Sequence, residues 1–329
     1  MLKNKFGWVT TLIFILTLEI IVFGLINPRF FNFNVLLYSI NDFAIIAIIA
    51  LFETYVIITG GIDISVGSII GLVSTVIGIT WQNGNTNIWA TIPIALAVGI
   101  LCGLFSGYLV AYTGVQAMVV TLGGMILYSG ISLVIIGMSG SSAYEGISGF
   151  PESFVNIANG SFFQIPNMVI LFFILFVIAY ILLHKTKYGR YIFLVGINKN
   201  AAVYSGINAR LITMSTYVLS GLSAAIAGII ITSYLGGSRP DLGSETTLPI
   251  VTAVVLGGTA ITGGRGNVAG TALAGIIVGI MRFGLQMANV SSEYISIATG
   301  LLLIIAVAAR SISTSLKFRR KIPTAPQTT

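Results

Sequence analysis

The chain has 329 residues, of which 56% are hydrophobic and only 8% are charged, and its mean hydropathy is +1.01. About a quarter of the residues in a soluble domain are charged, so this composition excludes an ordinary soluble protein. The net charge of +7 could suit nucleic acid. Its distribution along the chain, described below, instead indicates membrane topology, and we expect no nucleic-acid partner.

Successive apolar segments, each near the roughly 20 residues that cross a bilayer, indicate helices embedded in lipid. The spans are predicted near 8–26, 36–59, 66–81, 88–112, 117–138, 166–183, 211–234, 248–262, 267–286 and 294–310. The first apolar run reaches Ile26 and no Ala-x-Ala site follows it, which favours a retained span over a cleaved signal peptide. The sequence therefore predicts an all-α polytopic membrane protein with about ten transmembrane helices in one domain, 1–329.

The basic residues fall mainly on one side of this arrangement. When the spans alternate in direction, all of the 16 Lys and Arg residues except Arg29, Arg239 and Arg282 share one side. Cytoplasmic loops of membrane proteins are enriched in Lys and Arg. We therefore expect both termini, the loop 184–210 and the tail 311–329 to be cytoplasmic.

The stretch Gly60-Gly61-Ile62-Asp63-Ile64-Ser65-Val66-Gly67-Ser68 separates the second and third spans. One interpretation is a plain turn, with the glycines ending one helix and Ser65 or Ser68 capping the next. That interpretation leaves Asp63 unexplained, because a carboxyl group within membrane-length apolar sequence is costly and often functional. Glu53 lies in the preceding span and is a second such carboxyl. The candidate residues for a solute path are Gly60, Gly61, Asp63, Ser65, Gly67, Ser68 and Glu53.

A second stretch, residues 236–244, repeats the spacing of the first. Both have Gly-Gly, five intervening residues and then Gly-Ser, and the acid stands two places later in the second stretch. In a chain with 38 glycines, chance could also give this match. The first stretch follows the second span and the second follows the seventh, which run in opposite directions. The pattern thus predicts an inverted repeat, as in many transporters.

Several chemistries have no signature here. Neither a Gly-x-x-x-x-Gly-Lys-[Ser/Thr] phosphate loop nor a His-Glu-x-x-His motif occurs in the sequence. One histidine, His184, and one cysteine, Cys102, offer few metal ligands. We therefore expect no enzyme activity, no cofactor and no metal site, which leaves a pore or a carrier.

The cytoplasmic loop 184–210 contains a short helix-like stretch, with Asn198 as a possible cap and Gly206 as a stop. Its small residues would suit a helix that docks in a groove of another protein. The candidate docking residues are Gly189, Arg190, Gly196, Asn198, Ala201, Ala202, Ser205 and Gly206.

Three blocks of this sequence resemble the ribose-type sugar permeases of ABC importers. They are Gly-Gly-Ile-Asp-Ile-Ser-Val-Gly-Ser at 60–68, the loop from Gly189-Arg190 to Ser205-Gly206-Ile207, and Val255-Leu256-Gly257-Gly258-Thr259 with Gly263-Gly264-Arg265-Gly266. The resemblance covers nearly the whole chain. It implies a permease in the bacterial inner membrane, surrounded by lipid. It also implies ABC ATPase subunits on the loop 184–210, a second related permease and a periplasmic substrate-binding protein.

Finer features resemble the autoinducer-2 import permeases within that family. They are residues 144–151, Leu183-His184-Lys185-Thr186, Asp241-Leu242-Gly243, and Gly7-Trp8 with Ile26-Asn27-Pro28-Arg29. Phe193-Leu194 departs from the wider family, where many members have Ala. The alternatives are a permease for ribose or another monosaccharide, an ion-coupled secondary carrier that uses Glu53 and Asp63, and a scaffold that helps a paired permease.

Overall fold

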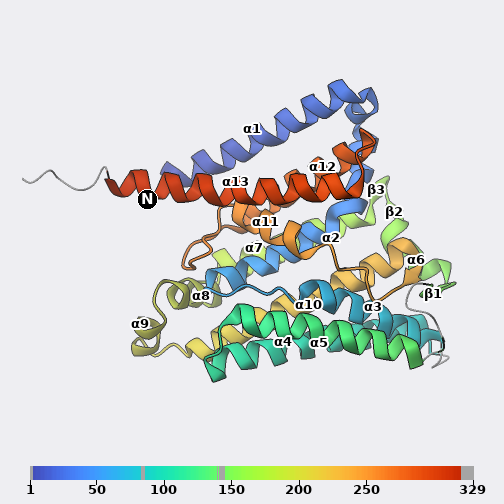
Figure 1. The fold of residues 1–329 in the computed structure, drawn as a ribbon, viewed down its shortest axis with the longest axis horizontal. Coiled ribbons are helices and arrows are strands. Elements are labelled where there is room, and N and C mark those ends of the chain that lie inside the picture. The colour runs from blue at the N-terminus through green and yellow to red at the C-terminus, as the bar shows by residue number, and fades with distance from the viewer. Residues whose placement is uncertain (1–2, 83–85, 139, 141–144, 320–329) are drawn as a thin grey trace, which may run out of the picture.

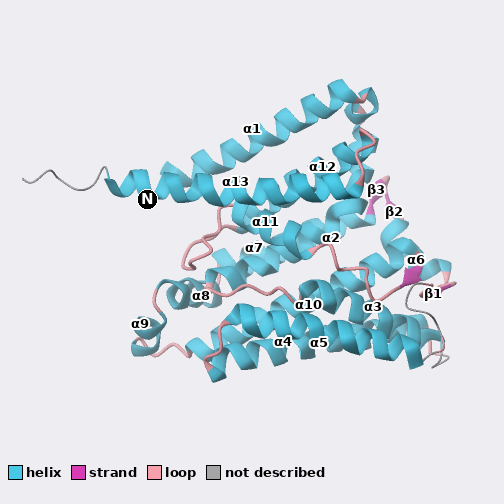
Figure 2. Cartoon of the chain, viewed as in Figure 1, coloured by secondary structure: helices cyan, strands magenta, loops and turns pink. Residues whose placement is uncertain are grey.

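A computed structural model describes residues 3–82, 86–138, 140 and 145–319. Tyr144 of the resemblance and the predicted tail beyond Arg319 lie outside the described residues. The described part is built from helices, with short strands only at one end (Figures 1 and 2). Helices α1 to α5 are Lys3–Ile26, Phe33–Ile58, Val66–Gln82, Ile88–Tyr108 and Ala117–Met138; a 3-10 turn (Pro28–Phe31) precedes α2 and a π-helical turn (Leu109–Thr113) follows α4.

The second half begins with a segment that carries all of the described strands but one. It holds β1 (Ile147–Ser148), α6 (Glu152–Asn159), β2 (Ser161–Phe162) and β3 (Ile165–Pro166). Next come α7 (Asn167–His184), α8 (Lys187–Ile197), α9 (Lys199–Tyr204), α10 (Ala209–Leu235) and β4 (Gly237–Ser238), then α11 (Thr247–Leu256), α12 (Val268–Met287) and α13 (Ser292–Arg319). Strand β1 pairs antiparallel with β4, with Ile147 opposite Ser238, and β2 pairs antiparallel with β3.

Each predicted span corresponds to a helix, but not every helix is long. Seven described helices are long and apolar enough to cross a membrane, and three shorter apolar ones are 66–82, 247–256 and 292–306. The predicted eighth span, 248–262, is wrong in length. Helix α11 ends at Leu256 because Gly258 takes φ +99° and the chain then turns, with the Ala260 N–H donating to the Arg265 carbonyl at 2.8 Å. At about 1.5 Å per residue, ten residues cover only half of a hydrocarbon core about 30 Å thick.

The helix packing follows an inverted repeat. Helices α2 to α5 correspond in order to α10 to α13. The contact of α4 with α10 corresponds to that of α12 with α2, and the contact of α3 with α10 corresponds to that of α11 with α2. Likewise, α3 packs on α5 and α11 packs on α13. Helices α2 and α10 pack on each other at the centre and run in opposite directions (Figure 1). Helices α1 and α7 do not follow this correspondence between the two halves, since both pack on α12. The contacts thus support the repeat that the sequence predicted.

Glycines permit the close contacts of both halves. A methyl group on Gly103 of α4 would lie 2.3 Å from the Tyr217 carbonyl oxygen of α10, and one on Gly279 of α12 would lie 2.1 Å from the Phe43 ring of α2. The two glycine-rich stretches also meet. A methyl on Gly67 would lie 2.5 Å from the Gly243 carbonyl oxygen, and one on Gly243 would lie 2.0 Å from that of Gly67. These two glycines occupy the same place in the repeated spacing, as expected near a pseudo-two-fold axis.

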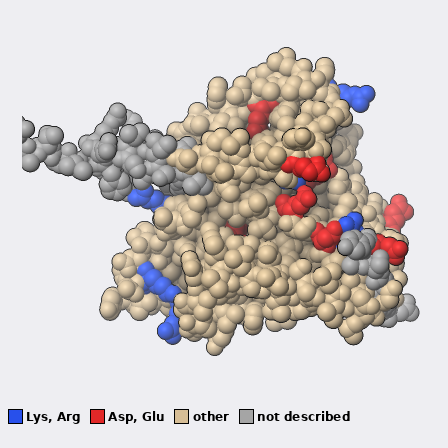
Figure 3. Space-filling model, viewed as in Figure 1, with Lys and Arg blue, Asp and Glu red and all other residues tan. Residues whose placement is uncertain are grey.

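The two ends of the helix stack differ in charge. The start of α1 and the described end of α13 lie at the end that carries α8 and α9, and α6 and β1 lie at the other (Figure 1). On the face shown in Figure 3, the charged side chains at the first end are Lys and Arg, whereas most Asp and Glu, together with some Lys and Arg, lie toward the second. This separation agrees with the predicted topology, in which the basic end is cytoplasmic.

Candidate functional site

The segment 59–65 is an extended break between α2 and α3. Gly60 takes φ +88°, and the Gly60 and Gly61 N–H groups donate to the Ile57 and Val56 carbonyl oxygens at 3.0 and 3.1 Å, which ends α2. Only glycine adopts such a φ at little cost. The chain then runs back toward the middle of the stack, where α3 begins (Figure 1). The predicted helix stop at these glycines is confirmed.

Asp63 and Glu53 hold this break in place. The Asp63 N–H donates to Glu53 Oε1 at 2.9 Å. Asp63 Oδ1 accepts from the Ser65 N–H at 3.0 Å and from the Ser65 hydroxyl at 2.6 Å. The Ser220 hydroxyl of α10 lies 2.9 Å from Asp63 Oδ2 and 3.3 Å from Glu53 Oε2. The Ser65 hydroxyl thus serves Asp63, and the interpretation of Ser65 as a side-chain cap of α3 is wrong.

Protein encloses this network on every side that the structure describes. Glu53, Asp63, Ser65 and Ser220 have no exposed surface. On the α5 side, the Thr121 hydroxyl donates to the Ile62 carbonyl at 3.1 Å. A buried carboxyl group requires hydrogen bonds from its surroundings, and these residues supply them. Whether the break borders a solute path stays a prediction.

Tyr217 of α10 is the one member of this region whose hydroxyl has no hydrogen-bond partner in the described part of the chain. The side chain is fully buried. Its hydroxyl lies directly against Gly61, since a methyl group there would be 2.2 Å from the oxygen. Gly61 is therefore a packing requirement of Tyr217 as well as part of the break.

The other candidate path residues differ in exposure. Gly60 is exposed, Gly67 is buried against Gly243, and Ser68 is half-buried with its hydroxyl donating to the Ser65 carbonyl at 2.8 Å. The structure thus brings Glu53, Asp63 and Ser65 together and leaves Gly60 at the surface.

The sequence reasoning missed Ser220 and Tyr217. Thr213, Thr216, Ser220 and Ser223 recur every three or four residues along the apolar helix α10. Residues at this spacing share one helix face. That polar face was a visible signal that α10 carries part of the site.

The candidate docking loop folds into two helices where one was predicted. Asn198 caps α9, accepting from the Ala201 N–H at 3.0 Å, and Gly206 takes φ +78° after it, as predicted. Helix α8 was not predicted; it begins after Thr186, whose hydroxyl oxygen accepts from the Gly189 N–H at 3.2 Å. Burial raises the pKa of Tyr188 in α8, although the 2.7 Å hydrogen bond with Ser215 partly offsets this.

The docking candidates separate into exposed and packed residues. The exposed ones are Arg190, Asn198, Ala201, Ser205 and Gly206. Gly189 and Ala202 are buried, and a methyl group on Gly189 would lie 1.8 Å from the Leu183 carbonyl oxygen. Gly196 is half-buried, and a methyl on it would lie 1.8 Å from the Ile58 carbonyl oxygen and 2.7 Å from the Gly264 nitrogen. These glycines hold α8 against the rest of the chain and do not present a contact surface.

Apolar side chains cover the outer surface of α8 and α9, and of these the sequence reasoning singled out only Leu194, as part of Phe193-Leu194. Tyr204 is 92% exposed, and the others are Tyr191, Leu194, Ile197 and Val203. We call these five residues the α8–α9 patch. Exposed apolar residues that cluster outside the bilayer mark interaction sites.

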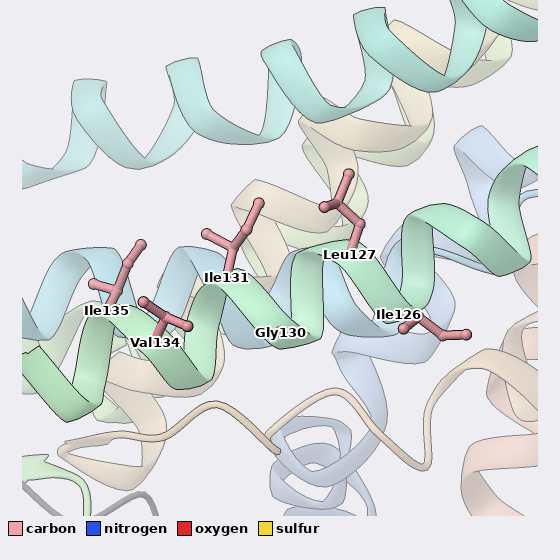
Figure 4. Close-up of a pocket in the computed structure, with 6 residues that line it drawn as sticks. All are labelled: Ile126, Leu127, Gly130, Ile131, Val134 and Ile135. Atoms are coloured by element: carbon pink, nitrogen blue, oxygen red, sulfur yellow. The ribbon is translucent and has the colours of Figure 1, made fainter.

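A shallow groove on α5 has a different character. It is lined by Ile126, Leu127, Gly130, Ile131, Val134 and Ile135, and several of these side chains project from one face of the helix (Figure 4). Its lining is entirely apolar, which suits lipid or another transmembrane helix and not a polar solute.

Comparison with known proteins places the chain among permeases. The family described as the permease component of branched-chain amino acid transport systems matches residues 35–307. The chain is 42% identical to the autoinducer 2 import system permease protein LsrD of Enterobacter sp. (strain 638), over 94% of each chain. It is 44% identical to the protein of that name from Photorhabdus temperata, over 94% of this chain and 93% of the relative. It is also 44% identical to the protein of that name from Yersinia pseudotuberculosis serotype O:3 (strain YPIII), over 95% of this chain and 93% of the relative. No solved structure matches.

Proposed function

This chain belongs to the family of transport-system permease components, and from that premise we propose that it is the membrane-spanning permease subunit of an ABC importer for autoinducer-2. The observation that carries the proposal is identity of 42–44% along nearly the full length of relatives that bear that name. The energy would come from ATP hydrolysed by separate ATPase subunits, because the sequence holds no phosphate-loop motif of its own.

The α8–α9 patch is where the ATPase would bind. It consists of exposed aromatic and aliphatic side chains at the basic end of the molecule, and the exposed cation Arg190 precedes Tyr191 in α8. Aromatic anchors dominate the energetics of protein interfaces, and Tyr204 at 92% exposure is the most prominent of them. A second related permease and a periplasmic substrate-binding protein would complete the importer, the latter at the end that carries α6 and β1.

The solute path would run beside the two breaks, segments 59–65 and 236–246. In the conformation described, protein encloses Asp63 and Glu53. Access for a solute would therefore require a shift of α3, which packs on α10 and meets the second break at the contact of Gly67 with Gly243. Alternating access through rocking of one repeat against the other has this form.

Uptake by a deletion strain that expresses the chain with its neighbouring subunits tests the proposal. We expect accumulation of labelled autoinducer-2 that stops when the ATPase is inactivated and that excess ribose does not compete. Strong competition by ribose would favour the monosaccharide permease. Uptake that collapses with a protonophore while ATP stays high would favour the ion-coupled carrier and contradict the proposal.

A further inference from the structure

Two buried carboxyl groups share too few donors at the α2–α10 contact. The Ser220 hydroxyl carries one proton but lies within hydrogen-bond distance of both Asp63 Oδ2 and Glu53 Oε2. No Lys or Arg in the described part of the chain forms an ion pair with either carboxyl. Burying a carboxylate without a compensating charge is expensive, and two side by side also repel each other.

An unsatisfied oxygen lies beside the same pair. Tyr217 is three residues before Ser220, so both side chains leave the same face of α10. Its hydroxyl has no partner among the described residues, is fully buried, and lies against Gly61, two residues before Asp63. Buried hydroxyls of this kind are normally satisfied, so a bound species is expected between this oxygen and the carboxyl groups.

We propose that Glu53, Asp63, Ser220 and Tyr217 bind one monovalent cation of the Na⁺ class, which fastens the 59–65 break to α10. A cation accounts for both observations together: it takes the Tyr217 oxygen and the carboxyl oxygens as ligands, and it offsets one of the two negative charges. A bound water molecule would satisfy Tyr217 but would leave the charge uncompensated.

The ligand set favours a monovalent over a divalent ion. Divalent Ca²⁺ takes six to eight oxygens, often with several carboxylates. The described residues contain no group of three or more His, Cys, Asp and Glu side chains suited to a metal ion. The site also lies beside the irregular backbone of a helix break, and discontinuous membrane helices coordinate Na⁺ at such breaks.

Equilibrium binding of ²²Na⁺ to the purified full-length chain in nanodiscs tests this directly. We expect saturable binding of one ion per chain. We also expect a melting temperature that is higher in NaCl than in choline chloride of equal ionic strength, by roughly 2 °C or more at ten times the Kd.

The variants separate this site from nonspecific effects. Tyr217→Phe keeps the ring but removes a ligand, and should weaken Na⁺ affinity by roughly tenfold or more; Glu53→Gln should abolish binding. Glu19→Gln, in α1, removes a different carboxyl within a membrane-length helix and should leave Na⁺ binding unchanged.

Three results would overturn the proposal: no saturable binding, full binding by Tyr217→Phe, or equal melting temperatures in the two salts with a rise only on acidification, which would assign a shared proton instead. The measurement uses neither an ATPase nor a solute, so its outcome is independent of the uptake assay.

Discussion

Replacing Gly71 by Ala tests the packing of α3 against the second break. A methyl group there would lie 1.9 Å from the Pro240 carbonyl oxygen and 2.8 Å from its carbonyl carbon. To reach the 3.4 Å of ordinary contact, that oxygen would have to move by about 1.5 Å. The obstacle is backbone, which cannot rotate away as a side chain can. Overpacking of this kind costs up to about 3 kcal/mol, and the better helix propensity of Ala returns about 1 kcal/mol.

The expected net destabilisation is therefore about 2 kcal/mol, or roughly 4 °C in melting temperature. Unfolding can be followed by the reaction of the one cysteine with a fluorogenic maleimide, because Cys102 is buried and reacts only when unfolding exposes it. The matched control is Gly130→Ala in α5, where a methyl group would meet nothing within 4 Å. It should melt at the same temperature or higher. Equal melting of Gly71→Ala and Gly130→Ala would refute the reasoning.

The remaining predictions concern the carboxyl network, the docking surface and the topology. Asp63→Ala should stop uptake while the protein still reaches the membrane, because the break loses its bonds to Ser65 and Ser220; retained uptake would support a scaffold role instead. Tyr204→Ala should reduce co-purification of the ATPase without affecting insertion, since the side chain is 92% exposed, and unchanged co-purification would rule out the α8–α9 patch. Reporter fusions at residues 150 and 329 should lie on opposite sides of the membrane, and signals from one side only would contradict the topology.

The structure changes one experiment that the sequence alone suggests. Gly189→Pro looks like a probe of ATPase docking, but Gly189 is packed against the Leu183 carbonyl and its N–H bonds to the Thr186 hydroxyl oxygen. Proline would remove that N–H, and its side chain would clash with the Leu183 carbonyl oxygen. Any loss of docking would therefore follow from a distorted α7–α8 junction. Arg190→Glu, at an exposed position, leaves this packing intact.

Local features were predictable from the sequence because their causes are local. Hydropathy located the helices, Gly60 ended α2, and Asn198 and Gly206 bounded α9. The predicted eighth span extended too far because apolar residues continue past Leu256 while the glycines that stop the helix are common throughout this chain. The partnership of Ser220 with Asp63 joins residues 157 positions apart, and one sequence carries no record of such a pairing.

The backbone contact that holds α8 at Gly196 has a mechanical consequence. Gly196 lies against both the last carbonyl of α2 and the Gly264 nitrogen, and the Gly264 N–H itself donates to that Ile58 carbonyl at 2.8 Å. One backbone junction therefore ties α8 to the terminus of a central helix from the first repeat and to the loop after α11 from the second. A displacement of α8 cannot be absorbed by side chains there, since none intervenes. A force that a bound partner applies to α8 would thus reach both halves of the molecule through this backbone junction, in addition to the contact of α8 with α10.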